Sequence, residues 1–511
     1  MSQPNFLLIT SDQQHWFTLG FQNPEIHTPN LDRLAQRGTT FNRAYCPNPT
    51  CTPTRASILT GMMPSSHGAW SLGTKLPEHH QTLGELLSAA GYRTGLIGKA
   101  HFQQLANQEA YPSIESYPLL RQLDYWKGFH GPWYGFDHIE LARNHADETH
   151  VGQHYALWME EKELKDWKQH FQNKYPGFDF NDAGQQTEAQ THTWSLPEKY
   201  HYNTWIAERS NAFMQECADA DQPFFLWSSF FDPHPPYLIP EPWDRMYDPA
   251  KVTVPELVPG EHDKNPEHFR KTQEPNPDFS DWEEAHGNAM HGCHSHLHTR
   301  EEIAKDIAIY YGMISCMDKY IGQILDQLDA LGLSENTTVL FTSDHGHFYG
   351  HHGLKAKGPF HYEDVIRVPY ILSHPGKVPE GVESDTLQSL VDIAPTFLKQ
   401  AGLEPPIAMT GVDQSTSWTH PDSATRDSLL VENRHQPTSI HIKTYVDERY
   451  KLTVYHNREY GELFDLQEDP QELNNLWNEP GAQTLKTELK EKLLHSVMAN
   501  ESLPMPRVAP A

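Results

Sequence analysis

Acidic, basic and imidazole side chains gather at four points of this chain, and each point directly follows a short apolar segment. The apolar segments are residues 5–10 (NFLLIT), 94–97 (TGLI), 223–231 (PFFLWSSFF) and 337–342 (TTVLFT). The polar residues that follow them are, in chain order, Asp12 and Gln13; Lys99 and His101; Asp232 and His234; and Asp344 and His345. Taken singly, an Asp or His after a strand is most often a helix cap or a turn residue. Four such clusters favour one shared site, because ligands of an open parallel sheet bind beyond the carboxyl ends of its strands.

Two kinds of binding are indicated by these residue types. Asp12, Asp344 and His345 offer the carboxylate and imidazole ligands that hold a divalent cation. Lys99, Lys357 and the histidines would form a local positive cluster that can hold an anion. An anion site needs such a cluster here, because 39 Lys+Arg against 68 Asp+Glu give a net charge of −29. Serine-hydrolase, P-loop and dinucleotide-binding motifs are absent from the sequence, so those enzyme classes have no support.

Cys51 opens the segment with the most specific pattern, residues 51–61 (CTPTRASILTG). A cysteine in the first turn of a helix lies at its positive end, which favours the thiolate. On these grounds alone an ordinary catalytic cysteine and a buried structural cysteine are both open.

This segment resembles the signature of the formylglycine-dependent sulfatases, C-x-P-S/T-R-x-x-x-L-T-G. The resemblance continues over most of the chain, at residues 5–12 (NFLLITSD), 28–38 (TPNLDRLAQRG), 92–101 (YRTGLIGKAH), 341–353 (FTSDHGHFYGHHG), 357–360 (KGPF) and 462–476 (ELFDLQEDPQELNNL). It implies hydrolysis of sulfate monoesters, in the manner of an arylsulfatase. It also implies an alkaline-phosphatase-like α/β/α fold.

In that family a maturase converts the cysteine to formylglycine after synthesis, and the hydrated form, a geminal diol, is the nucleophile. The resemblance implies a metal held by Asp12, Asp344, His345 and one hydroxyl of the modified Cys51. The metal is usually Ca2+, with Mn2+ and Mg2+ as alternatives.

The remaining roles are implied in the same way. Arg55 supports the modified residue. Sulfate oxygens are held by Lys99, His234 and Lys357, and His234 or Lys357 protonates the leaving oxygen. His101 takes a proton from the remaining hydroxyl, which expels sulfate and restores the aldehyde. The physical chemistry agrees, because fixed positive groups stabilise charge that builds on the transferred group.

This sequence departs from the family pattern at four positions, of which Thr54, in place of the commoner serine, is a conservative change. Gln13 stands where many members carry a second acid, so it is expected to ligate the metal or to turn toward the substrate. His347 and His351 stand where acids are frequent, at the expected pocket rim. With Gln13 at this position, the chain also resembles the phosphonate and phosphate monoester hydrolases of the superfamily. A phosphonate monoester or phosphodiester hydrolase is therefore the alternative. Those enzymes tend to carry Tyr and Thr in place of Lys99 and His101, so the sequence favours a sulfatase.

The elements that must position these residues follow an α/β pattern. Short apolar strands alternate with amphipathic helices at residues 83–90 and about 302–331, which predicts a mainly parallel sheet between helical layers. We expect one catalytic domain over residues 1–415, with insertions outside the sheet at about 103–200 and 238–300. We expect a smaller α+β subdomain over residues 416–511, with antiparallel strands in residues 445–455 and 462–466 and a helix at about 481–496.

Composition limits the partners and the location. An acidic chain lacks the basic footprint of a nucleic-acid or anionic-membrane binder. The sequence shows no leader pattern and no apolar run of membrane-spanning length, which predicts a cytoplasmic protein. Five scattered cysteines predict no disulfide framework. The expected partners are a small-molecule sulfate ester and a maturase.

Three properties stay open at this point. The His-rich segment 286–298 has metal-like spacing, but a loop or subunit contact is favoured over a zinc site. A homo-oligomer is neither required nor excluded. The loops that select one particular sulfate ester have no readable code.

Overall fold

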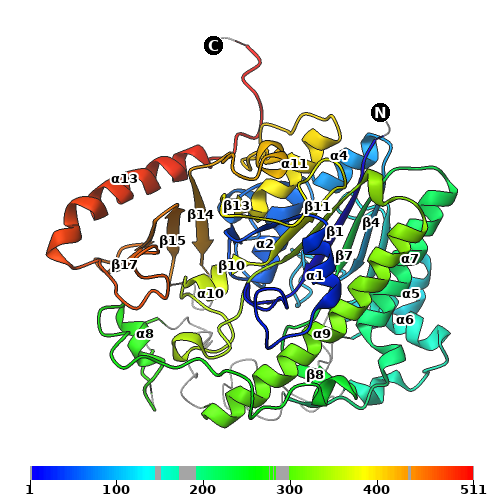
Figure 1. The fold of residues 1–511 in the computed structure, drawn as a ribbon. Helices are drawn as coiled ribbons and strands as arrows, with labels where there is room; N and C mark the ends of the chain where they lie inside the picture. The colour runs from blue at the N-terminus through cyan, green and yellow to red at the C-terminus, as the bar shows by residue number, and fades with distance from the viewer. Residues whose placement is uncertain are drawn as a thin grey trace.

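An eight-stranded, mainly parallel sheet forms the centre of the protein (Figure 1). The computed structural model describes residues 3–143, 151–171, 191–275, 277–279, 281–282, 298–434 and 439–509. From one edge to the other the strands are β12 (Val382–Ser384), β2 (Thr39–Phe41), β11 (Tyr370–Ser373), β9 (Thr337–Ser343), β1 (Asn5–Ser11), β7 (Phe224–Ser229), β4 (Arg93–Gly98) and β5 (His138–Leu141). Neighbours run parallel except at β11, which is antiparallel to β2 and β9. The carboxyl ends of β9, β1, β7 and β4 therefore meet at one edge.

Helices cover both faces of this sheet. Phe6 and Leu8 of β1 pack on the side of α2 (Cys51–Thr60), α4 (Leu83–Ala89) and α11 (Ile393–Gln400). Leu7 and Ile9 pack on the side of α1 (Pro29–Gln36), α7 (Tyr202–Asp219) and α9 (Arg300–Ala330). Because both faces are buried, the strand is an uninterrupted apolar run. The predicted α/β/α sandwich is confirmed.

The predicted core elements lie close to their observed bounds. The four apolar segments form β1, β4, β7 and β9, and the two predicted helices form α4 and α9. Helix α9 begins slightly earlier than expected, because a capping box joins Thr299 and Glu302 at its start. The apolar periodicity alone could not locate that first turn.

The prediction that residues 103–200 lie outside the sheet is wrong for one segment. Residues His138–Leu141 form β5, an edge strand that runs parallel to β4. Its sequence, HIEL, is short and alternates polar with apolar residues, so it lacks the signal of a buried strand. Within the second expected insertion, β8 (Tyr237–Ile239) pairs with β6 (Thr191–Thr193) in a separate two-stranded sheet. The His-rich segment 286–298 lies outside the described residues except for His298.

A second, antiparallel sheet follows near the end of the chain. Its strands are β14 (Ser428–Asn433), β15 (Ile442–Asp447), β16 (Tyr450–Tyr455) and β17 (Gly461–Asp465). The segment 445–455 thus contains parts of two strands joined by a turn. Tyr445, Leu452 and Leu463 of this sheet pack with Leu489 and Leu493 of α13 (Gln483–Ala499), the expected closing helix.

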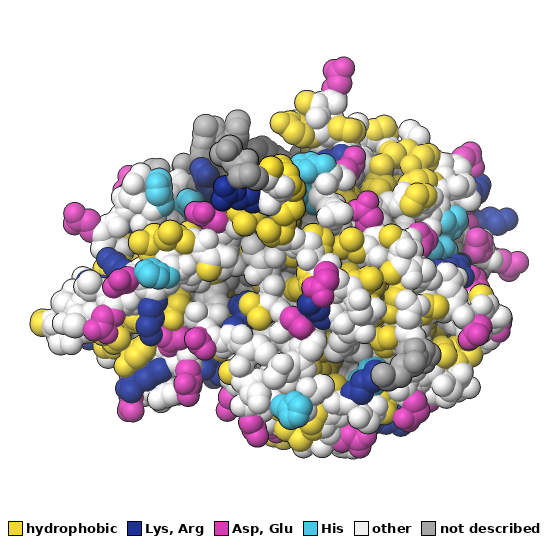
Figure 2. All heavy atoms as spheres, turned by 90° about the horizontal axis from the view of Figure 1, so that it is seen from above, with side chains coloured by type: hydrophobic (Ala, Val, Ile, Leu, Met, Phe, Trp, Pro, Cys, Tyr) yellow, Lys and Arg dark blue, Asp and Glu magenta, His cyan; other side chains and the backbone are white. Residues whose placement is uncertain are grey.

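The remaining elements are short. A three-stranded sheet is formed by β10 (Arg367–Val368), β3 (Ala44–Tyr45) and β13 (Gln388–Ser389). The other α-helices are α3 (Pro64–His67), α5 (Leu123–Gly128), α6 (Gln153–Glu161), α8 (Glu267–Lys271), α10 (Glu363–Ile366) and α12 (Ser415–Thr419). None of the described helices combines the length and the apolar character that crossing a bilayer requires. On the face that Figure 2 shows, acidic and basic side chains are interspersed rather than gathered by sign.

Candidate active site

Helix α2 places Cys51 at its first residue, with the side chain inside the protein. Thr50 before it is extended, at φ −142° and ψ 150°, and every residue of the helix is buried. The helix ends at Gly61, whose left-handed φ of 62° lets its N–H donate to the Ser57 carbonyl at 2.8 Å. The Cys51 side chain is therefore carried by a helix that is buried along its whole length and closed at its carboxyl end by Gly61.

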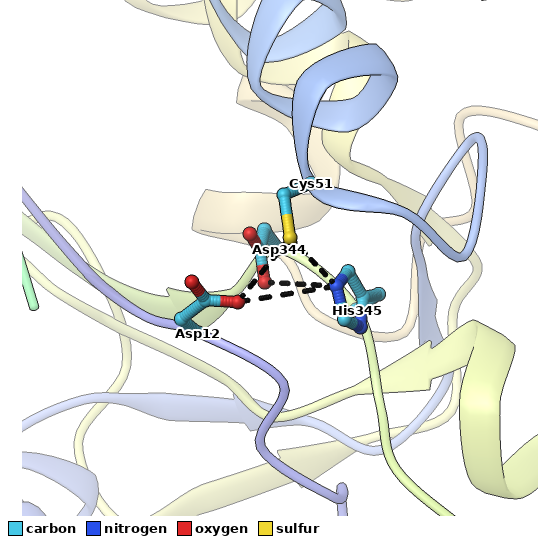
Figure 3. Close-up of side chains that lie close together, drawn as sticks. All are labelled: Asp12, Cys51, Asp344 and His345. Atoms are coloured by element: carbon cyan, nitrogen blue, oxygen red, sulfur yellow. Dashed lines mark hydrogen bonds and ion pairs between the residues drawn. The ribbon is translucent and has the colours of Figure 1, made fainter. Parts of the chain in front are cut away.

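Four buried side chains converge on one point beside this helix (Figure 3). Asp12 and Asp344 directly follow β1 and β9, which are neighbours in the sheet. Cys51 Sγ lies 3.5 Å from Asp12 Oδ1 and 3.2 Å from His345 Nε2. His345 Nε2 lies 3.9 Å from Asp12 Oδ1 and 3.8 Å from Asp344 Oδ1. One ligand atom from each of the four lies within 4.8 Å of the others, a spacing at which one cation can be shared.

The chemistry of this group fits a divalent cation. Gln13 has φ 62°, and its backbone N–H donates to Asp344 Oδ1 at 3.1 Å. Its side-chain amide is buried, and among the described residues neither its oxygen nor its nitrogen finds a hydrogen-bond partner. Such an orphaned amide beside two carboxylates is explained if its oxygen faces a cation or a substrate. The donor set therefore suits a metal, and its identity is not fixed by these residues.

Three buried cations surround the same group. Arg55 donates from Nε to Asp344 Oδ2 at 2.8 Å and from Nη1 to the Lys99 carbonyl at 2.9 Å. Lys99 Nζ contacts the Asp12 carboxylate and lies 3.9 Å from Cys51 Sγ. Lys357 Nζ lies 3.3 Å from Cys51 Sγ. Three cations against two carboxylates leave the site locally positive in an acidic protein.

The Cys51 thiol is held in its neutral form. Burial, followed by the charge of Asp12, raises its pKa to about 11, against the lowering effect of Lys357 and Lys99. The positive end of the helix does not by itself yield a thiolate here, because loss of hydration outweighs the nearby positive charges. This disfavours an ordinary thiolate nucleophile.

The two other predicted catalytic histidines lie on loops that follow β4 and β7. Burial, followed by the charges of Arg143 and Lys99, holds the pKa of His101 well below its usual range, so the imidazole is neutral. Neutral imidazole is the form that can accept a proton. His234 is half-buried, and its Nδ1 lies 2.5 Å from the Pro235 carbonyl. Because a carbonyl only accepts, Nδ1 carries a proton, and a proton passed to a leaving oxygen must therefore come from Nε2 of the protonated ring.

A second histidine group lies on the loops that follow Gln13 and His347. His15 Nε2 and His351 Nδ1 lie 2.9 and 3.2 Å from Asp364 Oδ1. Phe17 N–H donates to His15 Nδ1 at 3.0 Å, so the His15 proton is on Nε2 and points at Asp364. His352 lies between Asp364 and Glu261; although burial lowers its pKa, these two partners raise it to about 9. The group is satisfied by its own hydrogen bonds, which disfavours a second metal.

Several residues at the site carried no signal in the sequence. Ser229, the last residue of β7, accepts a hydrogen bond from Arg55 Nη1 at 2.7 Å. Tyr310 donates from its hydroxyl to the Gln13 carbonyl at 2.9 Å. Glu115 binds the backbone at His101, and Arg143 follows the unpredicted strand β5. Each acts through contacts distant in sequence, and only the position of Arg143 after a strand could have indicated it.

The family models give a direct comparison. Residues 4–403 match the model described as Sulfatase, and residues 350–499 match the model described as N-sulphoglucosamine sulphohydrolase, C-terminal. The chain is 31% identical over 491 residues to an arylsulfatase of Clostridium perfringens, covering 93% of this chain and 90% of that protein.

Solved structures share the fold. A phosphonate monoester hydrolase of Agrobacterium radiobacter superposes with a TM-score of 0.74 at 22% identity, covering 98% of this chain and 96% of that one. A protein solved in complex with its substrate D-glucosamine-2-N,6-O-disulfate superposes with a TM-score of 0.68 at 19% identity, covering 98% of both chains. At these identities the two structures establish the architecture, and chemistry must be argued from the residues.

Proposed function

The chain belongs to the sulfatase family of the alkaline phosphatase superfamily and is a sulfuric ester hydrolase, and from this premise we propose that Cys51, oxidised to formylglycine, is its nucleophile. The observation that carries the proposal is the position of Cys51 Sγ, 3.2 Å from His345 Nε2 and 3.3 Å from Lys357 Nζ. Sγ stands where an oxygen of the hydrated aldehyde would lie. A neutral thiol at this point is a poor nucleophile, whereas a diol oxygen among cations is well placed.

The metal belongs to the same proposal. Asp12, Asp344 and His345 would hold a divalent cation, with Gln13 able to add its amide oxygen. When bound, the cation supplies positive charge that lowers the pKa of the attacking hydroxyl. Calcium is the preferred candidate, with Mn2+ and Mg2+ as alternatives, because hard oxygen ligands dominate the set.

The cationic side chains are proposed to act on the sulfate group. Lys99 and Lys357 hold its oxygens and stabilise the charge that builds on them, while Arg55 keeps Asp344 and the Lys99 backbone in place. His234 or Lys357 protonates the leaving oxygen. Water screens the charges of Lys99 and Arg55 only weakly, because both side chains are fully buried.

His101 is proposed to reset the nucleophile. After transfer, the carbon of the modified residue carries one hydroxyl and one sulfated oxygen. His101 accepts the hydroxyl proton, the C=O bond forms, and the C–O bond to sulfate breaks with its electron pair leaving on sulfate. Its lowered pKa keeps it unprotonated for this step.

Substrate class and setting complete the proposal. We favour small-molecule aryl sulfates, with phosphonate monoesters or phosphodiesters as the alternative at the same site. Both a sulfate monoester and a phosphonate monoester carry one negative charge, so net charge does not separate them. We also propose a catalytic domain over residues 1–415, a subdomain over 416–511, and cytoplasmic maturation by a separate enzyme.

A hydrolysis panel tests the function. Fully modified protein is assayed with aryl sulfate, alkyl sulfate, sugar sulfate and phenylphosphonate esters, with aryl sulfate and phosphonate matched in leaving group. We expect the aryl sulfate to have the highest kcat/KM and the phosphonate to be a side activity. A preference for the phosphonate ester would make the alternative the correct function.

A further inference from the structure

The backbone at His101 is held in a conformation that non-glycine residues rarely adopt, with φ +57°. In this left-handed region the Cβ atom crowds the backbone, so surrounding contacts must stabilise it. Glu115 supplies those contacts by accepting three successive backbone N–H groups. His101 N lies 2.8 Å from Oε1, and the N atoms of Phe102 and Gln103 lie 2.9 and 2.8 Å from Oε2.

Glu115 is itself built into the fold. Its side chain is 1% exposed, and among the described residues it forms no ion pair. Its N–H donates to Ser113 Oγ at 3.2 Å, and the adjacent Ile114 N–H donates to Gln103 Oε1 at 2.8 Å. Successive N–H groups form a concave anion site, and here that site is filled by the protein's own carboxylate. Burying a carboxylate without a cation costs free energy. A neutral side chain could also close the loop between His101 and Glu115, so the charge at Glu115 indicates a role beyond loop closure.

The other end of this arrangement is the reaction centre. His101 follows Lys99 by two residues, and its buried ring interacts electrostatically with Arg143, Lys99, Arg55 and Asp12. Among the described residues its Nδ1 has no hydrogen-bond partner. No hydrogen bond at Nδ1 orients the ring, so its direction depends on packing and on the backbone, which Glu115 holds.

We propose that Glu115 is a positioning residue, whose carboxylate locks the left-handed backbone of His101 and so aims the imidazole at the hydroxyl of the sulfated intermediate. This inference rests on the proposed resetting role of His101. Without the lock, the carbon keeps both its hydroxyl and its sulfated oxygen, because no base accepts the proton. Sulfate then stays covalently attached to the modified residue. Transfer from the ester, which depends on Lys99 and Lys357, still occurs, but only once per enzyme molecule.

Three variants test the inference, each prepared with fully modified Cys51. Glu115→Gln keeps one accepting oxygen and replaces the other with an NH2 group, which cannot accept a hydrogen bond from a backbone N–H. Glu115→Asp keeps the charge on a shorter side chain. His101→Ala marks the loss of the base itself. Exposed Glu109 lies on the same loop, and Glu109→Gln is the matched control.

The readouts are kcat, KM and the mass of the intact protein during turnover of an aryl sulfate. For Glu115→Gln we expect kcat to fall about 10- to 100-fold, KM to stay level or fall, and a sulfate adduct to accumulate as in His101→Ala. Glu115→Asp should recover part of kcat and lose part of the adduct, and Glu109→Gln should match the parent protein.

Two results would overturn the inference, and they differ. If His101→Ala shows an adduct but neither Glu115 variant does, Glu115 has only a structural role. If His101→Ala shows no adduct, the proposed resetting step is wrong, and the inference falls with it. A Glu115→Gln protein that does not fold leaves Glu115→Asp to decide, because a partial adduct in that variant requires the lock.

Discussion

Removing the Lys99 ammonium should depress sulfate hydrolysis by two to three orders of magnitude. Lys99 Nζ lies 3.9 Å from Cys51 Sγ, the position of the proposed nucleophilic oxygen. A unit charge about 4 Å from developing negative charge contributes about 4 kcal/mol at an effective dielectric constant of about 20. That energy corresponds to roughly a thousandfold in rate, and loss of one transition-state donor typically costs about 10²–10³ in kcat.

The assay is steady-state hydrolysis of an aryl sulfate by Lys99→Ala with fully modified Cys51. The matched control is Lys492→Ala, which removes a lysine that is 57% exposed and 3.5 Å from Asp447, and which should leave kcat/KM within about twofold. A folded Lys99→Ala enzyme that keeps kcat/KM within tenfold of the parent would refute the reasoning.

The same substitution should have a second effect, on stability. Lys99 contacts the fully buried Asp12 carboxylate, and removing one partner of a buried pair typically costs about 3–5 kcal/mol. The metal-free Lys99→Ala protein should therefore melt at a lower temperature than the parent. Added Ca2+ should restore more of the melting temperature in the variant than in the parent, because the cation then balances Asp12 alone.

Three further outcomes are expected. Mass spectrometry of the tryptic peptide that contains Cys51 should show the lighter aldehyde or its hydrate when a maturase is co-expressed, and activity should scale with that fraction; full activity of Cys51→Ala would falsify the mechanism. Asp344→Asn should weaken Ca2+ binding in calorimetry and lower turnover by orders of magnitude, whereas unchanged affinity would place the metal elsewhere. Stability should fall as the pH drops below 6.5, because burial lowers the pKa of several histidines to about 3 and only the unfolded chain binds their protons in that interval. These residues are His67, His154, His201, His268 and His361. Each should contribute up to about 1.4 kcal/mol per pH unit to the slope of unfolding free energy. Asp232, Glu462 and Glu472, whose pKa burial raises to about 7, offset part of this slope, and a flat urea midpoint between pH 6.5 and 5 would contradict the prediction.

The central elements were predictable because their burial leaves a mark on the sequence. Residues 5–10 and 337–342 are buried on both faces, so they read as apolar runs that end where the chemistry begins. Asp12 and Asp344 could be placed near each other for the same reason, since parallel strands bring their carboxyl ends to one edge. The strand β5 left no such mark, because an edge strand of four residues is half polar.

The sequence predicts the residues that react or bind the ester, but it does not predict the residues that position them. Cys51 and Lys99 belong to motifs with specific spacing, whereas Glu115 is defined by a fold in which it meets the backbone fourteen residues away. Local pattern holds no information about such a pairing. The sequence also left the state of the Cys51 thiol open, because it places the residue at a helix start but does not reveal how completely the thiol is desolvated.

Selectivity at this site should depend on the donors around the transferred group rather than on total charge. Arg55, Lys99 and Lys357 exceed the two carboxylates by one charge before any metal is counted, so any singly charged ester is attracted. A sulfate monoester has little basicity and gains most from cations that need not release a proton, which Lys99 supplies. Resetting then needs a neutral base close by, and burial, followed by the charges of Arg143 and Lys99, keeps the pKa of His101 low. Lys99 thus contributes to both half-reactions, which favours sulfate transfer followed by expulsion over a site built only to bind anions.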